Sequence, residues 1–166
     1  PIASQGFRME NPPPKHEPAL PVFGDSFNQL IMADIIARAG HGSWLGVHFH
    51  AESDDWVELA LPWKAELVAD AASGVLASGP IVSLMDTASG VAVCRMRNGI
   101  VPLATVDLRV DYMRPARPER TVIGRVECYR MTRSIAFVRG IAYDEDASDP
   151  IAHVVGTFIL MQEPSA

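Results

Sequence analysis

The stretch from Ser73 to Arg97 has the hydrophobic spacing of a helix. Pro80 stands where the first helical position is expected, because that position leaves its N–H unpaired and proline has none. Apolar or small residues then recur three and four positions apart for about four turns. The predicted buried face consists of Ile81, Leu84, Met85, Ala88, Val91 and Ala92. The neighbouring face is also apolar or small, which indicates a helix that the rest of the fold encloses.

The period changes to two after this helix. In residues 105–113, one face carries Val106, Leu108, Val110 and Tyr112 and is predicted to meet the core; the other carries Thr105, Asp107, Arg109 and Asp111. Further strands are predicted over 45–53, 56–62, 121–130, 134–146 and 151–161, with a turn at Asn98-Gly99. The predicted fold class is α+β, with about six antiparallel strands curved around one long helix.

The N-terminal region has a different composition. Residues 1–25 are rich in proline, which excludes helix and disfavours a central strand, so an extended arm is predicted there. Ser26 is a suitable N-cap for a first helix over 27–40 that ends at Gly40, and residues 41–44 are predicted to form a turn. By length, residues 26–166 are expected to form a single domain.

Composition and charge narrow the function classes. The chain is 48% hydrophobic and 20% charged, with a net charge of −6, which argues against nucleic acid or a membrane as a partner. Cys94 and Cys128 lie in apolar settings and are expected to be reduced core thiols. With no signal peptide or apolar span recognised, a cytoplasmic location is predicted.

Two histidines raise the question of a metal. His48 and His50 alternate with Val47 and Phe49 on a predicted strand, so both imidazoles are expected on one face. A metal site would need a third ligand at suitable spacing, and none appears nearby. We therefore expect surface or interface histidines, no metal and no cofactor.

Arginine is concentrated in the second half of the chain. Between Arg109 and Arg139 there are eight Arg residues and no Lys. Two interpretations remain open at this point: the arginines form a solvated face of the sheet, or a few of them bind phosphates, which the planar guanidinium group does well.

One carboxylate, Asp86, stands inside the apolar helix, and no Lys or Arg lies within one turn of it. A buried carboxylate is costly unless it is hydrogen-bonded or has a chemical role. Asp86 is therefore either a structural residue, bonded to a neighbour such as Thr87 or Ser89, or the centre of the chemistry.

The run GVLASGPIVSLMDTASGVAV, followed by ATVDLRVDYMRPARPE, resembles the hotdog-fold thioesterases. The similarity is closest to the 4-hydroxybenzoyl-CoA and phenylacetate-pathway (PaaI-type) branch and covers roughly Val47 to Leu160. The resemblance implies a hotdog fold, an acyl-CoA substrate and no cofactor beyond the coenzyme A of that substrate. It also implies self-association as a homodimer or homotetramer, because the family's active site lies between two subunits.

Individual roles follow from the same resemblance. Asp86 matches the catalytic carboxylate, which acts as nucleophile or as general base for water. The backbone N–H at Ser78, beside Gly79, matches the donor that polarises the thioester carbonyl, and a helix N-terminus suits that task physically. Thr105 matches a hydroxyl that helps to hold the attacking water.

The resemblance also places substrate-binding residues. Arg114 and Arg117 fall where the coenzyme A nucleotide often meets basic side chains. The family turn usually reads Asn and then His-Gly-Gly, whereas this chain has Asp70 or its neighbour Ala71, and then Ala77-Ser78-Gly79. Ala77 cannot orient a substrate or water. The sequence therefore leaves two functions open: an acyl-CoA thioesterase, or a non-catalytic hotdog protein that binds acyl-CoA or acyl carrier protein.

Overall fold

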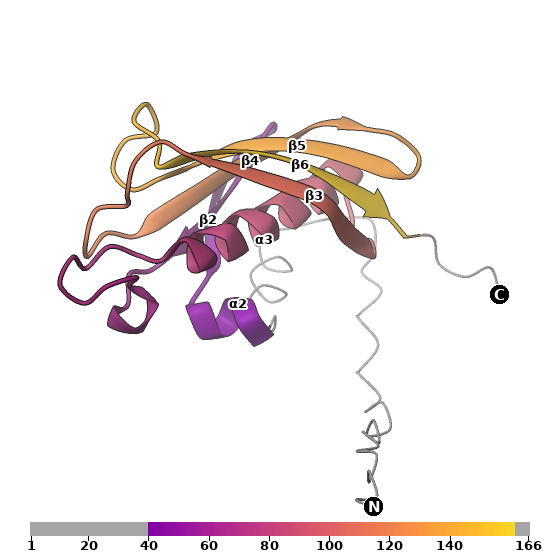
Figure 1. The fold of residues 1–166 in the computed structure, drawn as a ribbon. Coiled ribbons are helices and arrows are strands. Elements are labelled where there is room, and N and C mark those ends of the chain that lie inside the picture. The colour runs from indigo at the N-terminus through magenta and orange to yellow at the C-terminus, as the bar shows by residue number, and fades with distance from the viewer. Residues whose placement is uncertain (1–39, 162–166) are drawn as a thin grey trace, which may run out of the picture.

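The computed structural model describes residues 40–161. Its elements are α2 (Gly40–Leu45), β1 (His48–Glu52), β2 (Val57–Leu61), the short 3₁₀ helix η1 (Ala65–Leu67), α3 (Ser78–Arg97), β3 (Leu103–Tyr112), β4 (Val122–Met131), β5 (Ile135–Tyr143) and β6 (Ala152–Leu160). The strands form one antiparallel sheet in the order β1-β2-β4-β5-β6-β3, which curves over α3 (Figure 1). The predicted α+β hotdog fold is confirmed. The proline-rich arm and residues 27–39 of the predicted first helix lie outside the described residues. The predicted end of that helix at Gly40 is wrong, because Gly40 is helical and belongs to α2.

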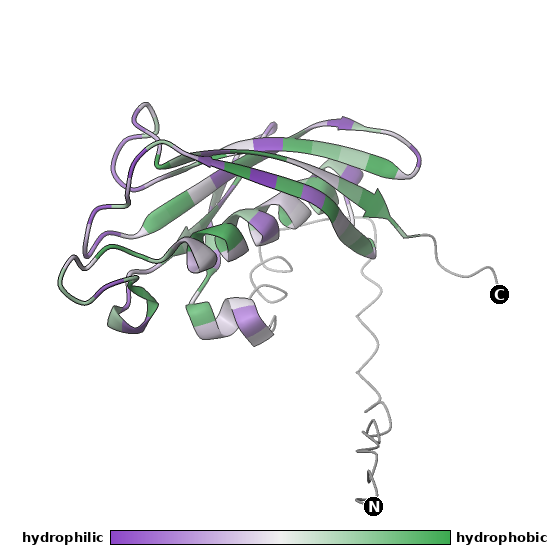
Figure 2. Cartoon of the chain, viewed as in Figure 1, coloured by the Kyte–Doolittle hydropathy of each residue, from purple (hydrophilic) through white to green (hydrophobic). Residues whose placement is uncertain are grey.

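The core lies between α3 and the sheet. All six residues of the predicted helix face are buried, as are the strand side chains that meet them, among them Leu59, Leu61, Val122, Val126, Val138 and Phe158. Figure 2 shows hydrophobic residues along α3 and along the strands above it. However, the described residues do not enclose α3 completely, because Val82 is 37% exposed. No helix within residues 40–161 is long and apolar enough to cross a membrane.

Helix α3 begins two residues earlier than predicted. Ala77 is the N-cap and Ser78 the first helical residue, so Pro80 is the third residue of the helix rather than the first. The shift is sterically harmless, because the first four N–H groups of a helix have no intrahelical acceptor and proline fits among them. The other end agrees with the prediction: Asn98 adopts the left-handed conformation, and the chain turns there.

The predicted turn over residues 41–44 is wrong, because these residues belong to α2. The glycine that ends α2 is Gly46 at φ +85°, where the Gly46 and Val47 N–H groups donate to the Ser43 and Gly42 carbonyls. This paired arrangement is a Schellman motif, for which glycine is favoured. As a result, the strand predicted from residue 45 begins only at His48.

Strand β3 does not keep the uniform alternation predicted for it. Thr105 pairs with Phe158 and Asp107 with Thr157, so Val106 is an extra residue in a β-bulge. Phe158 is buried, and residues paired across antiparallel strands share a face, so Thr105 faces α3 together with Leu108. Val106 is 61% exposed. The prediction that Val106 faces the core and Thr105 faces away is therefore wrong.

A second bulge affects the histidines of β1. His48 pairs with Ala60, whereas the register shifts between Phe49 and Ala51 and leaves His50 as the extra residue. The strict alternation that was expected to place both imidazoles on one face is therefore interrupted. Within residues 40–161, no group of three or more His, Cys, Asp or Glu side chains is arranged to hold a metal ion.

Candidate active site

The β3 bulge brings Thr105 into contact with Asp86. The Thr105 hydroxyl donates a hydrogen bond to Asp86 Oδ1 at 2.8 Å, joining the middle of α3 to the edge strand of the sheet. Asp86 is half-buried rather than fully buried, so the described residues leave it accessible to water. The arrangement is a solvent-accessible carboxylate held in place by one hydroxyl.

The neighbours proposed as structural partners of Asp86 do not bind it. Thr87 Oγ1 donates to the Ser83 carbonyl at 2.8 Å, along the helix. Ser89 is fully buried, and its hydroxyl has no hydrogen-bond partner among the described residues. The hydroxyl that Asp86 does bind comes from a distant part of the sequence.

The start of α3 presents the second part of the site. Ser78 and Gly79 are exposed, and no side chain caps the helix, because Ala77 occupies the N-cap. Neither the Ser78 nor the Gly79 N–H group has an acceptor among the described residues. Two N–H groups at the positive end of a helix dipole can stabilise an oxyanion.

These two parts of the site are separated along α3. Asp86 lies eight residues after Ser78, and a helix rises about 1.5 Å per residue, so the two positions are about 12 Å apart along the axis. A thioester carbonyl cannot contact both within one chain.

A cavity of about 350 Å³ borders the start of α3 on the side of α2. Ala77 and Gly79 line it together with His41 and Trp44 of α2, and most of its other walls are apolar. His41 Nε2 lies 3.0 Å from Ser83 Oγ, a contact that ties α2 to α3. An imidazole therefore lies beside this helix terminus, although Ala77 itself offers only a methyl group.

Asp70 is engaged in its own turn. Its carboxylate accepts the Ser73 N–H at 3.1 Å, and its carbonyl accepts the Gly74 N–H at 3.1 Å. Asp70 thus closes the tip of a short hairpin, whose Ala77 end leads into α3. Its proposed role as a substrate ligand stays a prediction.

Arg114 is held by acidic groups instead of being open to a phosphate. Its guanidinium group forms two hydrogen bonds to Asp144, at 2.9 and 2.6 Å, and lies 3.0 Å from Asp149. The Asp144 side chain is inaccessible to solvent, and the Arg114 side chain is 19% exposed. No local sequence pattern indicates this buried ion pair, because its partners are 30 residues apart.

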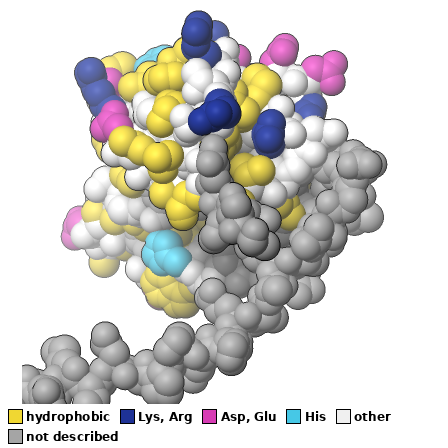
Figure 3. Space-filling model, turned by 90° about the vertical axis from the view of Figure 1, so that its right-hand side faces the viewer, with side chains coloured by type: hydrophobic (Ala, Val, Ile, Leu, Met, Phe, Trp, Pro, Cys, Tyr) yellow, Lys and Arg dark blue, Asp and Glu magenta, His cyan; other side chains and the backbone are white. Residues whose placement is uncertain are grey.

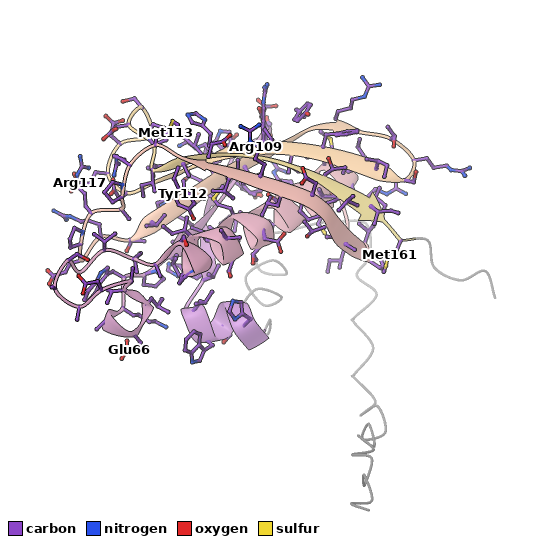
Figure 4. All side chains as sticks on the ribbon, viewed as in Figure 1. Glu66, Arg109, Tyr112, Met113, Arg117 and Met161 are labelled. Atoms are coloured by element: carbon purple, nitrogen blue, oxygen red, sulfur yellow. The ribbon has the colours of Figure 1, made fainter. Side chains whose placement is uncertain are left out.

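Arg117 belongs to the same cluster and lies on its solvent-exposed side. Its backbone N–H donates to Asp144 at 2.8 Å, and its guanidinium group reaches Glu145 at 2.8 Å while remaining 45% exposed. Figure 4 shows Arg117 at the end of the molecule where α3 begins. Of the two arginines, Arg117 is the one that can still meet a ligand.

The ion pairs shift the acidities of this cluster. Hydrogen bonds from Arg114, and from the backbone N–H groups of Arg117 and Glu145, hold the pKa of Asp144 well below its usual value despite burial. The pKa of Arg114 is raised in return, mainly by its hydrogen bond to Asp144. Both groups therefore stay charged through the neutral range.

A second charged cluster, on the outer face of the sheet, was missed by the sequence analysis. Glu58 is buried and accepts hydrogen bonds from Arg125 at 2.7 Å and from the Tyr143 hydroxyl at 2.6 Å. Arg125 also lies over the Trp56 ring at 4.6 Å. Burial and Glu58 raise the pKa of Tyr143 to about 12. Every charge in this cluster has a partner, which indicates a structural role.

Comparison with known proteins bears on the family and the fold of this chain. The thioesterase superfamily profile matches residues 73–151, which include α3 and strands β3 to β5. The Escherichia coli protein named medium/long-chain acyl-CoA thioesterase YigI is 31% identical over 90 aligned positions, which cover 46% of this chain and 57% of the relative. A crystal structure of a Pseudomonas aeruginosa protein is 38% identical and has a TM-score of 0.72, covering 78% of this chain and 96% of that chain.

The chain is similar to the thioesterase superfamily over residues 73–151, just under half of its length, and it has the hotdog fold. It spans about 57% of the length of the E. coli relative that it matches. A variant of the phenylacetic acid degradation protein PaaI from Thermus thermophilus is 21% identical, with a TM-score of 0.63 over 74% of this chain and 99% of that chain. That likeness shows a shared fold, and membership of the PaaI-type branch stays a prediction.

Proposed function

We propose that this protein hydrolyses acyl-CoA thioesters to the free acid and coenzyme A. The observation that carries the proposal is the contact between Asp86 and Thr105, a reachable carboxylate oriented by a hydroxyl on a superfamily scaffold.

In the general-base route, Asp86 takes a proton from water as the water oxygen attacks the thioester carbonyl carbon. The Ser78 N–H donates to the oxygen as it becomes negatively charged. The C–S bond then breaks, the carbonyl re-forms, and the coenzyme A sulfur leaves as a thiolate that receives the proton. In the alternative route, Asp86 attacks the carbonyl carbon directly, the C–S bond breaks and the coenzyme A thiolate leaves and takes up a proton. Water then hydrolyses the resulting anhydride, which releases the free acid and restores Asp86.

A complete site in this scheme requires two chains. The 12 Å separation estimated along α3 prevents one chain from placing both Asp86 and the Ser78 N–H at one carbonyl. Strand β3 is an edge strand of ten residues that carries Thr105. Its unpaired edge and the exposed side chains of Val106 and Met113 favour pairing with β3 of a second copy. On another face, which lies at the right-hand side of Figure 1, exposed hydrophobic side chains also lie beside basic and acidic ones (Figure 3).

Replacing the carboxylate tests the reaction directly. Asp86→Asn keeps the shape of the side chain and removes the base, so kcat should fall by roughly 10²-fold or more. The matched control is Asp107→Asn, a second aspartate of the same region whose side chain is exposed on β3. Release of free thiol from medium-chain, long-chain and aromatic acyl-CoA esters measures the rate, and thermal unfolding shows that both variants are folded.

Medium- and long-chain esters come first in that panel because of the name of the E. coli relative. No thiol release from any ester by the wild-type protein, combined with saturable binding of an acyl-CoA thioether, would favour the non-catalytic binder. Full activity of a folded Asp86→Asn protein would remove Asp86 from the mechanism.

Mixing two inactive variants tests the shared site. Ser78→Pro deletes the N–H donor, and with it the serine hydroxyl. It should preserve the helix start, because proline suits the first helical position and Ala77 before it already has the extended conformation that proline requires. In a dimer of Asp86→Asn and Ser78→Pro chains, one of the two shared sites is intact, so mixing should restore activity. If both groups come from one chain, mixing restores nothing.

A further inference from the structure

Tyr112, the last residue of β3, is hydrogen-bonded to Ser78, the first residue of α3. Its hydroxyl donates a hydrogen bond to the Ser78 carbonyl at 3.1 Å, and its side chain is 41% exposed. Figure 4 shows Tyr112 between β3 and the start of α3. Burial raises the pKa of the Tyr112 phenol, so the hydroxyl keeps its proton at neutral pH and can donate.

The bonded carbonyl belongs to the same peptide group as the Gly79 N–H. A peptide group is planar, so a hydrogen bond that fixes the Ser78 carbonyl also fixes the direction of the Gly79 N–H. Electron density drawn toward the carbonyl oxygen makes the N–H of that peptide a stronger donor. Pro80 follows and has no N–H, so Ser78 and Gly79 supply the first two donors of the helix.

We propose that Tyr112 is a positioning residue for the carbonyl site: through the Ser78–Gly79 peptide it orients and strengthens the Gly79 N–H, which serves as a donor beside the Ser78 N–H. This inference rests on the proposed hydrolysis. It gives Gly79 a chemical role and explains why a tyrosine follows the aliphatic residues Leu108 and Val110 at the end of the core-facing row of β3.

The chain contains a matched contrast. Ser83 Oγ donates to the Gly79 carbonyl at 3.1 Å, in the same turn of the helix. That carbonyl belongs to the peptide group between Gly79 and Pro80, which has no N–H. Both hydroxyls therefore support the first turn, but only the Tyr112 hydroxyl acts on a peptide group with a donor.

The test compares Tyr112→Phe, Ser83→Ala and Tyr129→Phe with the wild-type protein. Tyr129 is a tyrosine of β4 that is 51% exposed. Tyr112→Phe should lower kcat by about threefold to tenfold, in line with the loss of one hydrogen bond. KM should stay unchanged, because the donor acts mainly in the transition state. Ser83→Ala and Tyr129→Phe should keep kcat within about twofold. An unchanged kcat in Tyr112→Phe, or an equal loss in Ser83→Ala, would overturn the proposal.

The mixed dimer separates this proposal from the proposed function. When Tyr112→Phe is added to the Asp86→Asn chain, which supplies the N–H donors of the intact site, the restored activity should fall. When it is added to the Ser78→Pro chain, the activity should stay the same. Equal effects on both chains would overturn the positioning role. A wild-type protein with no hydrolytic activity would instead overturn the proposed function.

A vibrational measurement gives a readout that altered folding would not move. With a bound acyl-CoA ester in the Asp86→Asn background, hydrogen bonds from the helix start should lower the carbonyl stretching frequency. Adding Tyr112→Phe should reverse part of that shift, and adding Tyr129→Phe should not. The same frequency with and without the Tyr112 hydroxyl would contradict the proposal.

Discussion

Two aspartates show how differently this fold treats a carboxylate. The Asp144 side chain is inaccessible to solvent and binds Arg114 and Arg117. Asp86 is half-buried, and the hydrogen bond to it comes from the neutral Thr105 hydroxyl. The first arrangement saturates the carboxylate with positive charge, which stabilises the fold. The second leaves lone pairs available for a reaction. In the proposed function, the sparsely bonded carboxylate is therefore the reactive one, whereas the cluster of charges around Asp144 stabilises the fold.

The largest effect on stability is expected at Asp144. Asp144→Asn leaves Arg114 without its buried charge partner, so the free energy of unfolding should fall by about 3–5 kcal/mol. Chemical denaturation measures the loss. The control is Asp149→Asn in the same cluster, whose side chain is 55% exposed and whose loss should stay below about 1 kcal/mol. Equal losses in the two variants would remove the distinction between them.

The next effect concerns the other aspartate. Thr105→Val deletes the hydroxyl that orients Asp86, and a hydrogen bond to a charged group contributes about 1.5–3 kcal/mol, so kcat should fall by roughly tenfold or more. Thr105→Ser keeps the hydroxyl and should retain most of the activity. Steady-state rates, together with melting temperatures, distinguish this loss from unfolding. A fully active Thr105→Val protein would show that Asp86 needs no orienting partner.

The stability of the fold should fall at acid pH because of Asp144. The pKa of Asp144 is lowered in the folded state from an ordinary value of 3.8, mainly by Arg114. The unfolded chain therefore binds the proton more readily. The stabilisation is complete above about pH 5 and is lost as the pH falls through the unfolded value toward the folded one. Denaturation at several pH values should show a steeper loss in the wild-type protein than in Asp144→Asn, and equal slopes would assign the acid sensitivity to other groups.

The smallest effect is expected at the exposed edge of the Asp144 cluster. Arg117→Ala should raise KM for the CoA ester a few-fold and leave kcat unchanged, and the difference should shrink as salt screens the contact. Arg114→Ala should mainly lower the melting temperature, because its guanidinium group is bound by Asp144. Steady-state kinetics at two salt concentrations measure KM in Arg117→Ala, and thermal unfolding measures the melting temperature of Arg114→Ala. An unchanged KM in Arg117→Ala would show that the nucleotide binds elsewhere.

Local periodicity predicted the parts of the fold that depend on neighbouring residues. The spacing of Ile81, Leu84 and Met85 fixes which side of α3 is buried, because each helix turn repeats the same facing. The six strands were also visible from their alternation and turns. Of the candidate site, the position of Asp86 on the helix followed from the sequence, whereas Ser78 was predicted to lie just before the helix start and is its first residue. The roles of both came from the family resemblance.

The remaining features depend on contacts between distant residues. The Arg114–Asp144 pair and the Glu58–Arg125 pair join separate strands or loops, and no local pattern indicates which acid meets which base. The bond between Tyr112 and Ser78 had a weak signal, since a phenol on a core-facing row needs a hydrogen-bond partner. The bulge at Val106 had no signal in the sequence, because its residues are ordinary strand formers.

The bulge at Val106 has a consequence for sequence alignment. It joins two halves of β3 whose side chains alternate in opposite phase, so Thr105 and Leu108 face α3 although three positions separate them. Without Val106, Thr105 and Asp107 would be consecutive, and both halves would keep their present pairing as a regular strand. A homologue one residue shorter here would therefore superpose on the same site. Aligned without a gap, its equivalent of Thr105 would be assigned to the wrong column, and the hydroxyl would look lost when it had been kept.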